Sequence, residues 1–369
     1  MSQSNVGQHV ILTGANGFVA SHILSILIER GYTVTATVRS QAKANDIIDT
    51  HPSWKNAVKF VIVADFTSQG PFDDIFRNSS HPFDYVIHTA SPLKFQVSDI
   101  QKEMIEPAEK GRALTQASRT TEILRAAHHF GGPSLKRFVL LGSAVSVLNS
   151  FEDLSREGRP YTEKDWNPVT AEQAIARNDT ILGYNVSKTR AEAAAWQFME
   201  KAKPAFDLAV INPDIIIGPM IHPIHGPKSI NETNHFAIAS FIDGTHKRIE
   251  GVTFPFYHFV DVRDVARSHV DALTNPAAAN QRVLLIAGLI SPQLVVNTIR
   301  QNFPSLKDRI PEGNPSQVLP PDVHPTGWDT RISLDILAKG SPDGRWEYIE
   351  LEKSIVDAVN SILSTGIMD

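Results

Sequence analysis

A short apolar run, a glycine-rich turn and a helical stretch follow one another near the start of this chain. The run covers residues 10–12, and the turn reads Thr13-Gly14-Ala15-Asn16-Gly17. Glycine allows a sharp bend and a close approach of the backbone to a ligand, and the N–H groups at a helix start favour a pyrophosphate. This order predicts a dinucleotide-binding turn between a strand and a helix. A turn that merely contains two glycines is the alternative.

Strands and helices alternate through the amino-terminal half. Each strand candidate is a short, nearly continuous apolar run, which is typical of strands covered on both faces. The predicted strands are 9–13, 33–38, 58–63, 85–89 and 137–142. The predicted helices are 18–30, 41–50, 71–77 and a long one within 101–130. The alternation predicts an α/β fold built on a Rossmann-type, doubly wound parallel sheet.

The second half is less regular. Its predicted elements are helices at 180–201, 262–273, 291–302 and 349–363, strands at 208–211, 256–260 and 283–287, and a proline-rich loop over 304–329. We expect an NADP-binding Rossmann domain over residues 1–212, with its sheet completed by parts of 256–290. A smaller carboxyl-terminal substrate-binding lobe is expected over 213–255 and 291–369.

The composition excludes several classes of function. The 369 residues include no cysteine, which removes disulfides, thiolate catalysis and cysteine-based zinc sites. A net charge of −5 does not indicate the excess of basic residues that is typical of proteins that bind nucleic acid. No apolar run approaches the roughly 18 residues of a membrane span, and the polar start leaves no room for a signal peptide. We expect a cytoplasmic protein without nucleic-acid or membrane partners.

Tyr184 and Lys188 lie four residues apart in a helical stretch, so their side chains share one face of the helix. A free tyrosine has a pKa of about 10, which makes it a poor acid–base catalyst at neutral pH. A nearby lysine ammonium favours the phenolate, so the pair predicts an activated tyrosine. Chance gives such a pair in roughly a quarter of chains of this composition, but its position after the fifth strand favours the catalytic interpretation.

Ser143 directly follows the predicted strand at 137–142. Ligands bind at the carboxyl ends of the strands in sheets of this kind, and a hydroxyl there can donate to a carbonyl oxygen. Ser146 is the second choice. A serine that merely ends the strand is the alternative.

Arg39 closes the second predicted strand, where NAD-binding chains place an acidic residue. Arg39 and Lys43 would instead hold a 2′-phosphate through charge-assisted hydrogen bonds. They predict NADPH/NADP+ as the cofactor, against the alternative of an ordinary solvated basic surface. Asp65, after the third strand, is a candidate to accept from the adenine amino group or to cap a turn.

Taken together, these residues resemble the extended short-chain dehydrogenase/reductases. The shared motifs are Thr13-Gly14-x-x-Gly17, Arg39, Asp65, Ser143, Tyr184-x-x-x-Lys188 and Asn212-Pro213. Residues 17–22 and 184–192 are similar to the branch of dihydroflavonol reductases and cinnamoyl-CoA reductases, and within it to fungal NADPH-dependent aldehyde and ketone reductases. The resemblance covers nearly the whole chain and is weakest at 214–255 and after 304.

The resemblance implies roles for individual residues. Tyr184 would be the general acid, Lys188 would hold the cofactor ribose and lower the pKa of Tyr184, and Ser143 would orient the substrate carbonyl. The implied cofactor-binding set also contains Tyr184 and Lys188; its other members are Thr13, Gly14, Asn16, Gly17, Phe18, Val19, Arg39, Lys43, Asp65, Phe66, Ala90, Ser91, Pro213 and Ile215. Candidate walls of an apolar substrate pocket, each of which also suits the core, are Phe95, Val145, Leu182, Met220 and Phe241.

The chain departs from the family pattern in two places. The family usually has Pro-Ala-x-x-Gly-Thr-x-Asn in the fourth helix, whereas residues 112–119 read here as an insertion, with Glu122 where asparagine is usual. An insertion of about eight residues is close to two helical turns, so one long helix accommodates it nearly in phase; a bulge or a gene-model error is the alternative. Gly142 replaces the usual serine or threonine before Ser143.

The leading interpretation is NADPH-dependent reduction of an aldehyde or ketone to an alcohol. The alternatives are a sterol-type dehydrogenase or nucleotide-sugar epimerase of the same family, and a non-catalytic dinucleotide sensor. Arg39 speaks against epimerases, which generally use NAD, and the intact Tyr184–Lys188 pair speaks against the sensor. His222 and His225 have no carboxylate at a ligand-like spacing, so we expect no metal and a substrate-side loop. Monomer and homodimer stay open.

Overall fold

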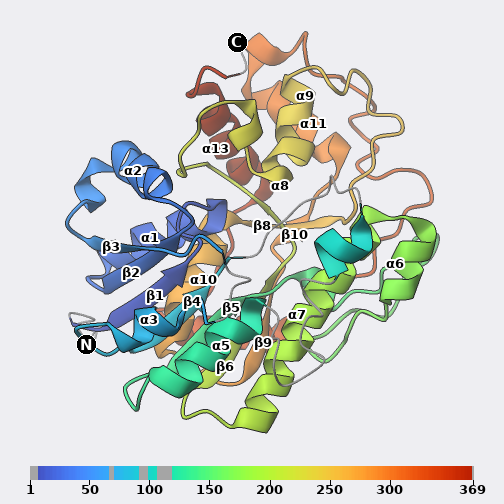
Figure 1. The fold of residues 1–369 in the computed structure, drawn as a ribbon. Coiled ribbons are helices and arrows are strands. Elements are labelled where there is room, and N and C mark those ends of the chain that lie inside the picture. Colours follow the sequence, from blue (N-terminus) through green and yellow to red (C-terminus); the bar gives the residue numbers. More distant parts are fainter. Residues whose placement is uncertain (1–6, 66–69, 91–98, 106–118, 368–369) are drawn as a thin grey trace.

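The centre of the molecule is a seven-stranded parallel sheet with helices on both sides (Figure 1). The computed structural model describes residues 7–65, 70–90, 99–105 and 119–367. The strands are β1 (His9–Thr13), β2 (Thr33–Val38), β3 (Val58–Ile62), β4 (Tyr85–His88), β5 (Arg137–Leu141), β6 (Asp207–Pro213) and β9 (Gln281–Leu285). Their order is β3-β2-β1-β4-β5-β6-β9. The expected Rossmann-type doubly wound sheet is confirmed, and its switch point lies between β1 and β4.

Each face of the sheet has its own apolar core because side chains alternate along a strand. Val10 and Leu12 pack on one side and Ile11 on the other. The first face is covered by α1 (Phe18–Glu29), α2 (Gln41–Thr50), α10 (Val262–Thr274) and α12 (Arg331–Gly340). The second is covered by α3 (Asp73–Arg77), α5 (Arg119–Phe130) and α7 (Thr180–Ala202).

A smaller unit lies beyond the carboxyl ends of the strands, at the top of Figure 1. Its three-stranded sheet consists of β7 (Ile215–Ile217), β8 (His258–Asp261) and β10 (Gly288–Leu289). Its helices are α8 (Glu232–Asn234), α9 (Ser240–Ile242), α11 (Pro292–Asn302) and α13 (Leu351–Leu363). A separate apolar core joins these elements, and α6 (Ala171–Arg177) packs beside α7.

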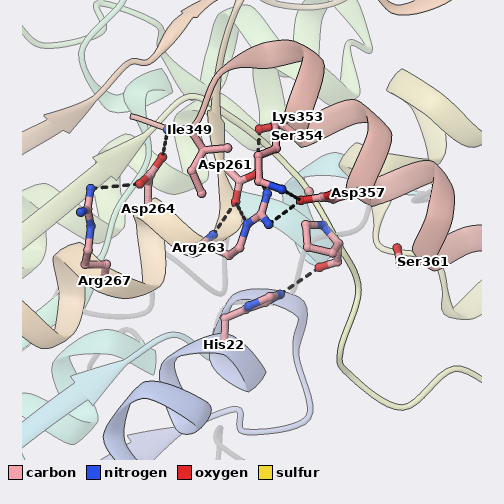
Figure 2. Close-up of polar contacts among 12 residues, drawn as sticks. His22, Asp261, Arg263, Asp264, Arg267, Ile349, Lys353, Ser354, Asp357 and Ser361 are labelled. Carbon is pink, nitrogen blue, oxygen red and sulfur yellow. Dashed lines mark hydrogen bonds and ion pairs between the residues drawn. The ribbon is translucent and has the colours of Figure 1, made fainter. Parts of the chain in front are cut away.

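A polar cluster fastens this smaller unit to the main sheet (Figure 2). Arg263 in α10 donates to both carboxylate oxygens of Asp261 at 2.8 Å and to Asp357 in α13 at 2.6 Å. Ser354 in α13 also donates to Asp261, at 2.7 Å. His22 in α1 lies 2.9 Å from a backbone oxygen of the loop after β7. These contacts hold α13 over the start of α10 and next to α1.

Most predicted elements agree with the structure to within a few residues, but the structure differs in several places. The strand predicted at 208–211 continues through Asn212 to Pro213, because a proline is tolerated at the end of a strand where its missing N–H is not needed. The three-residue strand β7 follows immediately and was not expected. Residues 331–340, expected in the smaller lobe, form α12, which packs on α10 and β9.

The long helix expected within 101–130 is described in two parts. Gln101–Ile105 forms one π-helical turn and Arg119–Phe130 forms α5. Residues 106–118 lie outside the described part of the chain, so the extra residues at 112–118 do as well. In α5, Glu122 accepts from Arg125 at 3.3 Å, so the residue that departs from the family pattern has an ionic partner one helical turn away.

Candidate active site

The glycine-rich turn after β1 has the backbone geometry that a bound dinucleotide needs. Gly14 has φ +70°, and a Cβ on it would lie 3.2 Å from Cα of Ala90. Thr13 is fully buried, and its hydroxyl accepts from the N–H groups of Thr89 at 3.1 Å and Ala90 at 3.2 Å. The Thr13 side chain therefore links the end of β1, where the turn begins, to the residues that follow β4.

The start of α1 is left open for an anion. Gly17 is its N-cap, no side chain caps it, and its first turn holds no acidic residue. The Phe18 side chain packs against the cores of both the sheet and the smaller unit, and Val19 is buried. Asn16 is partly exposed beside them. Backbone N–H groups and the helix dipole at this end suit a pyrophosphate, so the residues present fit a dinucleotide.

Of the residues expected at the adenosine end, Arg39 precedes α2, Lys43 lies in α2 and Asp65 follows β3. Arg39 follows β2 and is exposed. The ammonium of Lys43 lies 3.1 Å from Asp46, so an added 2′-phosphate would compete with that carboxylate for it. Asp65 is exposed after β3. Two further expected residues, Phe66 and Ser91, lie outside the described residues.

Ser143 and Tyr184 are brought together by β5 and α7. Asp179 caps α7 by accepting from the N–H groups of Ile181 at 2.9 Å and Leu182 at 3.1 Å. The Ser143 hydroxyl donates to that of Tyr184 and lowers its pKa, but burial outweighs this and raises the pKa to about 12. Tyr184 therefore holds its proton at neutral pH.

Ser146, the second choice for the hydroxyl at the end of β5, lies elsewhere. It is fully buried, and its hydroxyl has no hydrogen-bond partner in the part of the chain that the structure describes.

Lys188 lies one helical turn beyond Tyr184 on α7. Burial lowers the pKa of Lys188 to about 8, and the negative charge of Glu192 opposes this shift. His88, at the end of β4, is fully enclosed. Burial and the Lys188 charge lower its pKa to about 3, so the imidazole is neutral. Its Nδ1 lies 2.8 Å from the Thr13 hydroxyl.

A buried ionic network next to Ser143 and Lys188 was not expected from the sequence. Glu192 in α7 accepts from Nε of Arg282 at 2.6 Å and from Nδ2 of Asn212 at 2.8 Å. The same Asn212 nitrogen donates to the backbone oxygen of Ser143 at 3.0 Å. The pair Glu192–Arg282 is thus linked through Asn212 to the residue that contacts Tyr184. The regular spacing of Tyr184, Lys188 and Glu192 was the available signal.

The same network explains the glycine before Ser143. A Cβ on Gly142 would lie 2.6 Å from Nδ2 of Asn212 and 2.8 Å from Cγ1 of Val210. Both distances are shorter than any normal carbon contact, so a side chain at this position would displace Asn212. The departure at Gly142 therefore accommodates the Asn212 hydrogen bond to Ser143.

A cavity of about 240 Å³ opens beside these residues. Its lining comes from four loops and from the start of α7; the residues are Leu148, Asn149, Ser150, Glu152, Leu154, Tyr161, Asp179, Ile181, Leu182, Asn185, Asp214, Pro255, Phe256, Tyr257, His258, Pro325, Thr326 and Trp328. Ser143, Tyr184 and Lys188 are not in this lining, but Leu182 and Asn185, which flank Tyr184 on α7, are. The lining combines aromatic and apolar side chains with three carboxyl groups, and a concave site of this kind suits a small organic substrate.

Of the expected pocket walls, only Leu182 lines this cavity. Phe241 is fully buried and Met220 nearly so, and both pack in the core of the smaller unit. Val145 is buried, and its backbone oxygen accepts from Asn167 at 2.7 Å. The structure thus places Phe241 and Met220 in the core, the other role that their apolar side chains allowed. Phe95 lies outside the described residues.

Three residues of the cavity lining, Tyr257, His258 and Trp328, come from distant segments, the start of β8 and two loops, that gave no local signal. Asp214 was detectable, because it follows Pro213 at the carboxyl end of a strand. Of the residues expected at the nicotinamide, Pro213 is buried at the end of β6 and Ile215 is buried at the start of β7.

The loop that carries His222 and His225 was expected on the substrate side, and the structure corrects this. His225 lies 3.2 Å from Asp46 in α2, and His222 Nε2 lies 3.0 Å from the backbone oxygen of Ser229. The loop therefore reaches the helix that carries Lys43. Among the described residues, no group of three or more His, Asp or Glu side chains is arranged to hold a metal ion.

Comparison with known proteins places the chain in a family. A sequence model of the NAD dependent epimerase/dehydratase family matches residues 10–287. The chain belongs to this family. Among curated relatives, it is 32% identical to the cinnamoyl-CoA reductase CAD2 of Medicago truncatula, over 98% of both chains. It is 28% identical to the NADPH-dependent methylglyoxal reductase GRE2 of Saccharomyces cerevisiae, over 96% of this chain and 98% of the relative.

A solved structure extends the comparison. The crystal structure of Gre2 from Candida albicans in complex with NADPH superposes with a TM-score of 0.81 at 29% identity, covering 97% of this chain and 99% of that one. The resemblance drawn from the sequence motifs, to this family and to its reductase branch, is confirmed. Within the described ranges, no helix is both long and apolar enough to cross a bilayer.

Proposed function

We propose that this member of the epimerase/dehydratase family reduces an aldehyde or a ketone to an alcohol, with NADPH as hydride donor. The observation that carries the proposal is the Ser143–Tyr184 hydrogen bond at the carboxyl end of β5, with Lys188 one helical turn away. The NADPH-bound structure of a similar chain and the reductase names of two relatives support the cofactor and the direction.

Different residues of the chain have different roles in the reduction. When bound, NADPH supplies the hydride that the carbonyl carbon receives. Tyr184 donates its phenolic proton to the carbonyl oxygen; burial raises the pKa of Tyr184 to about 12, so this proton is present at neutral pH. Ser143 donates to the same oxygen and fixes its position. The Lys188 ammonium stabilises the tyrosinate that remains after the transfer.

The proposed cofactor site is formed by the glycine-rich turn after β1 and by the ends of the neighbouring strands. We assign the pyrophosphate to the backbone from Gly14 to Val19 and the 2′-phosphate to Arg39, with Lys43 added once it leaves Asp46. The remaining proposed contacts are Asn16, Phe18, Ala90, Tyr184, Lys188, Pro213 and Ile215. The substrate occupies the cavity beside Asp214. The cytoplasmic location and the division at residue 212 are further parts of this proposal.

The test is Tyr184→Phe, with Tyr161→Phe as a matched control from the wall of the same cavity. Tyr184→Phe should bind NADPH nearly as well as the wild type and turn over aryl ketones, keto esters and short dialdehydes slower by a factor on the order of 10² to 10⁴. Tyr161→Phe should retain most of the turnover. Full turnover by Tyr184→Phe would refute its role. NADPH binding by the wild type without turnover of any carbonyl would favour a dinucleotide sensor.

A further inference from the structure

Asp214 is one of three acidic residues in the wall of the cavity. It stands between β6 and β7, only 8% exposed, and lines the cavity beside Tyr184. Its Oδ1 accepts from the N–H of Ile215 at 2.9 Å, and its own N–H donates to the backbone oxygen of Leu285 at 3.3 Å. Oδ2 has no hydrogen-bond partner among the described residues. Since Asp214 lines the cavity, this oxygen is available to a polar group bound there.

The other polar groups in the wall do not satisfy Oδ2. Glu152 is already occupied, because it accepts from the Tyr161 hydroxyl at 3.1 Å and from the N–H of Thr326 at 2.5 Å. Asp179 is the cap of α7. None of the described residues in the lining is a lysine or an arginine, and burial lowers the pKa of His258 to about 4, which leaves it neutral.

The ionisable side chains of the cavity wall limit which chemical groups of a substrate Asp214 can bind. An anionic substituent would face three carboxyl groups and no cation, so it is disfavoured. Burial raises the pKa of Asp214 to about 8, so at neutral pH its carboxyl offers both an O–H donor and an acceptor. A hydroxyl group is also both donor and acceptor, and it pairs with the carboxyl in either protonation state.

Resting on the proposed carbonyl reduction, we propose that Asp214 binds a hydroxyl group on a substrate carbon close to the reacting carbonyl. The enzyme then prefers hydroxy ketones and hydroxy aldehydes over their deoxy analogues. The carbonyl oxygen lies at Ser143 and Tyr184, and Asp214 lines the cavity together with Leu182 and Asn185, which flank Tyr184 on α7, so the recognised hydroxyl belongs on a neighbouring carbon.

The experiment compares hydroxyacetone with 2-butanone, in which a methyl group replaces the hydroxyl. The quantity measured is the ratio of their kcat/KM values with NADPH. The wild type should favour hydroxyacetone. Asp214→Leu should reduce the ratio roughly tenfold, as expected for one net hydrogen bond, and mainly through the KM of hydroxyacetone. Asp214→Asn, whose amide both donates and accepts, should retain most of the preference.

Glu152→Gln is the matched control, since Glu152 lines the same cavity but has both oxygens occupied; its ratio should equal that of the wild type. An Asp214→Leu ratio equal to the wild-type ratio would overturn the inference, as would an equal fall in Glu152→Gln. If Asp214→Leu does not fold, Asp214→Ala gives the same comparison. Reduction of other carbonyls without a hydroxyl preference overturns this inference alone, whereas no reduction of any carbonyl overturns the proposed function with it.

Discussion

Replacing Glu192 by glutamine tests the ionic network that positions Ser143. The site needs two acceptor oxygens, because Oε1 accepts from Arg282 at 2.6 Å and Oε2 accepts from Asn212 at 2.8 Å. Glutamine has one acceptor oxygen, and its NH₂ group would face another donor. Glu192 is 1% exposed and Arg282 is 9% exposed, so water cannot compensate. Glu192→Gln therefore removes one acceptor, either from Nε of Arg282 or from Nδ2 of Asn212, although both side chains keep their hydrogen bonds to backbone oxygens.

The expected loss of stability is large. Removing one partner of a buried ion pair costs about 3–5 kcal/mol, against a typical total stability of about 5–15 kcal/mol. In urea, this loss should lower the unfolding midpoint by on the order of 1 M. The activity should fall too, since Asn212 holds the backbone of Ser143. The Glu192 charge raises the pKa of Lys188, so its removal should move the basic limb of kcat/KM to lower pH.

Equilibrium unfolding in urea, followed by tryptophan fluorescence, measures the midpoint. The double variant Glu192→Leu/Arg282→Met removes both charges, so it should recover part of the stability; the backbone oxygens of Glu163 and Asp165 still lose their donor. It still lacks the acceptor for Asn212, so kcat should stay low. A Glu192→Gln midpoint equal to that of the wild type would refute the energetic argument. Full recovery of kcat in the double variant would refute the positioning of Ser143 through Asn212.

Three other predictions concern the cofactor and the titratable groups. Arg39→Ala should weaken NADPH binding roughly ten- to a hundredfold, as for the loss of one charge-assisted hydrogen bond. It should weaken NADH binding much less. An equal loss of affinity for both cofactors in fluorescence titrations would exclude the 2′-phosphate contact. The kcat/KM for reduction should fall above pH about 8 as the Lys188 ammonium is lost. Lys188→Arg should move that fall to higher pH. An unchanged pH profile in this variant would contradict the role of Lys188. Burial raises the pKa of Asp214 to about 8 in the folded state, so the stabilising contribution of this carboxyl should be lost as pH rises from about 4 to 8, by up to about 6 kcal/mol. Asp264 and the buried histidines also have shifted pKa values in this range, so the quantity to measure is the difference in unfolding free energy between the wild type and Asp214→Asn in urea at several pH values; a difference that does not change with pH would refute this contribution.

The half of the structure that holds the cofactor turn was predictable because its signals are local. Continuous apolar runs marked the buried strands, and the first two end where expected, at Thr13 and Val38. The four-residue spacing placed Tyr184 and Lys188 on one face of α7. Ser143 follows the strand that brings it to Tyr184. Each of these inferences needs only neighbouring residues and the topology of a parallel sheet.

The remaining features depend on contacts between distant segments, which the sequence pattern does not reveal. Asn212 and Arg282 meet Glu192 across 20 and 90 residues, and the role of Gly142 becomes visible only once Asn212 is placed. The cavity wall was mostly mispredicted for a related reason. An apolar residue such as Phe241 suits the core and a pocket equally well, and only its packing decides between them.

Asp214 and the loop residues of the cavity should select different properties of the substrate, a hydroxyl group and the overall size. Its backbone is held by β9 through Leu285, and its carboxyl is held by the N–H of Ile215, so this polar group is fixed before the substrate arrives. The opposite walls, such as Tyr257 and Trp328, stand on loops. Loops tolerate substitution and rearrangement better than strands do. Changes at Tyr257 and Trp328 should therefore alter the size of carbonyl compound that is accepted, while the hydroxyl preference continues to follow Asp214. Selection by size and selection by hydroxyl are then independent, because the groups responsible belong to different elements of the fold.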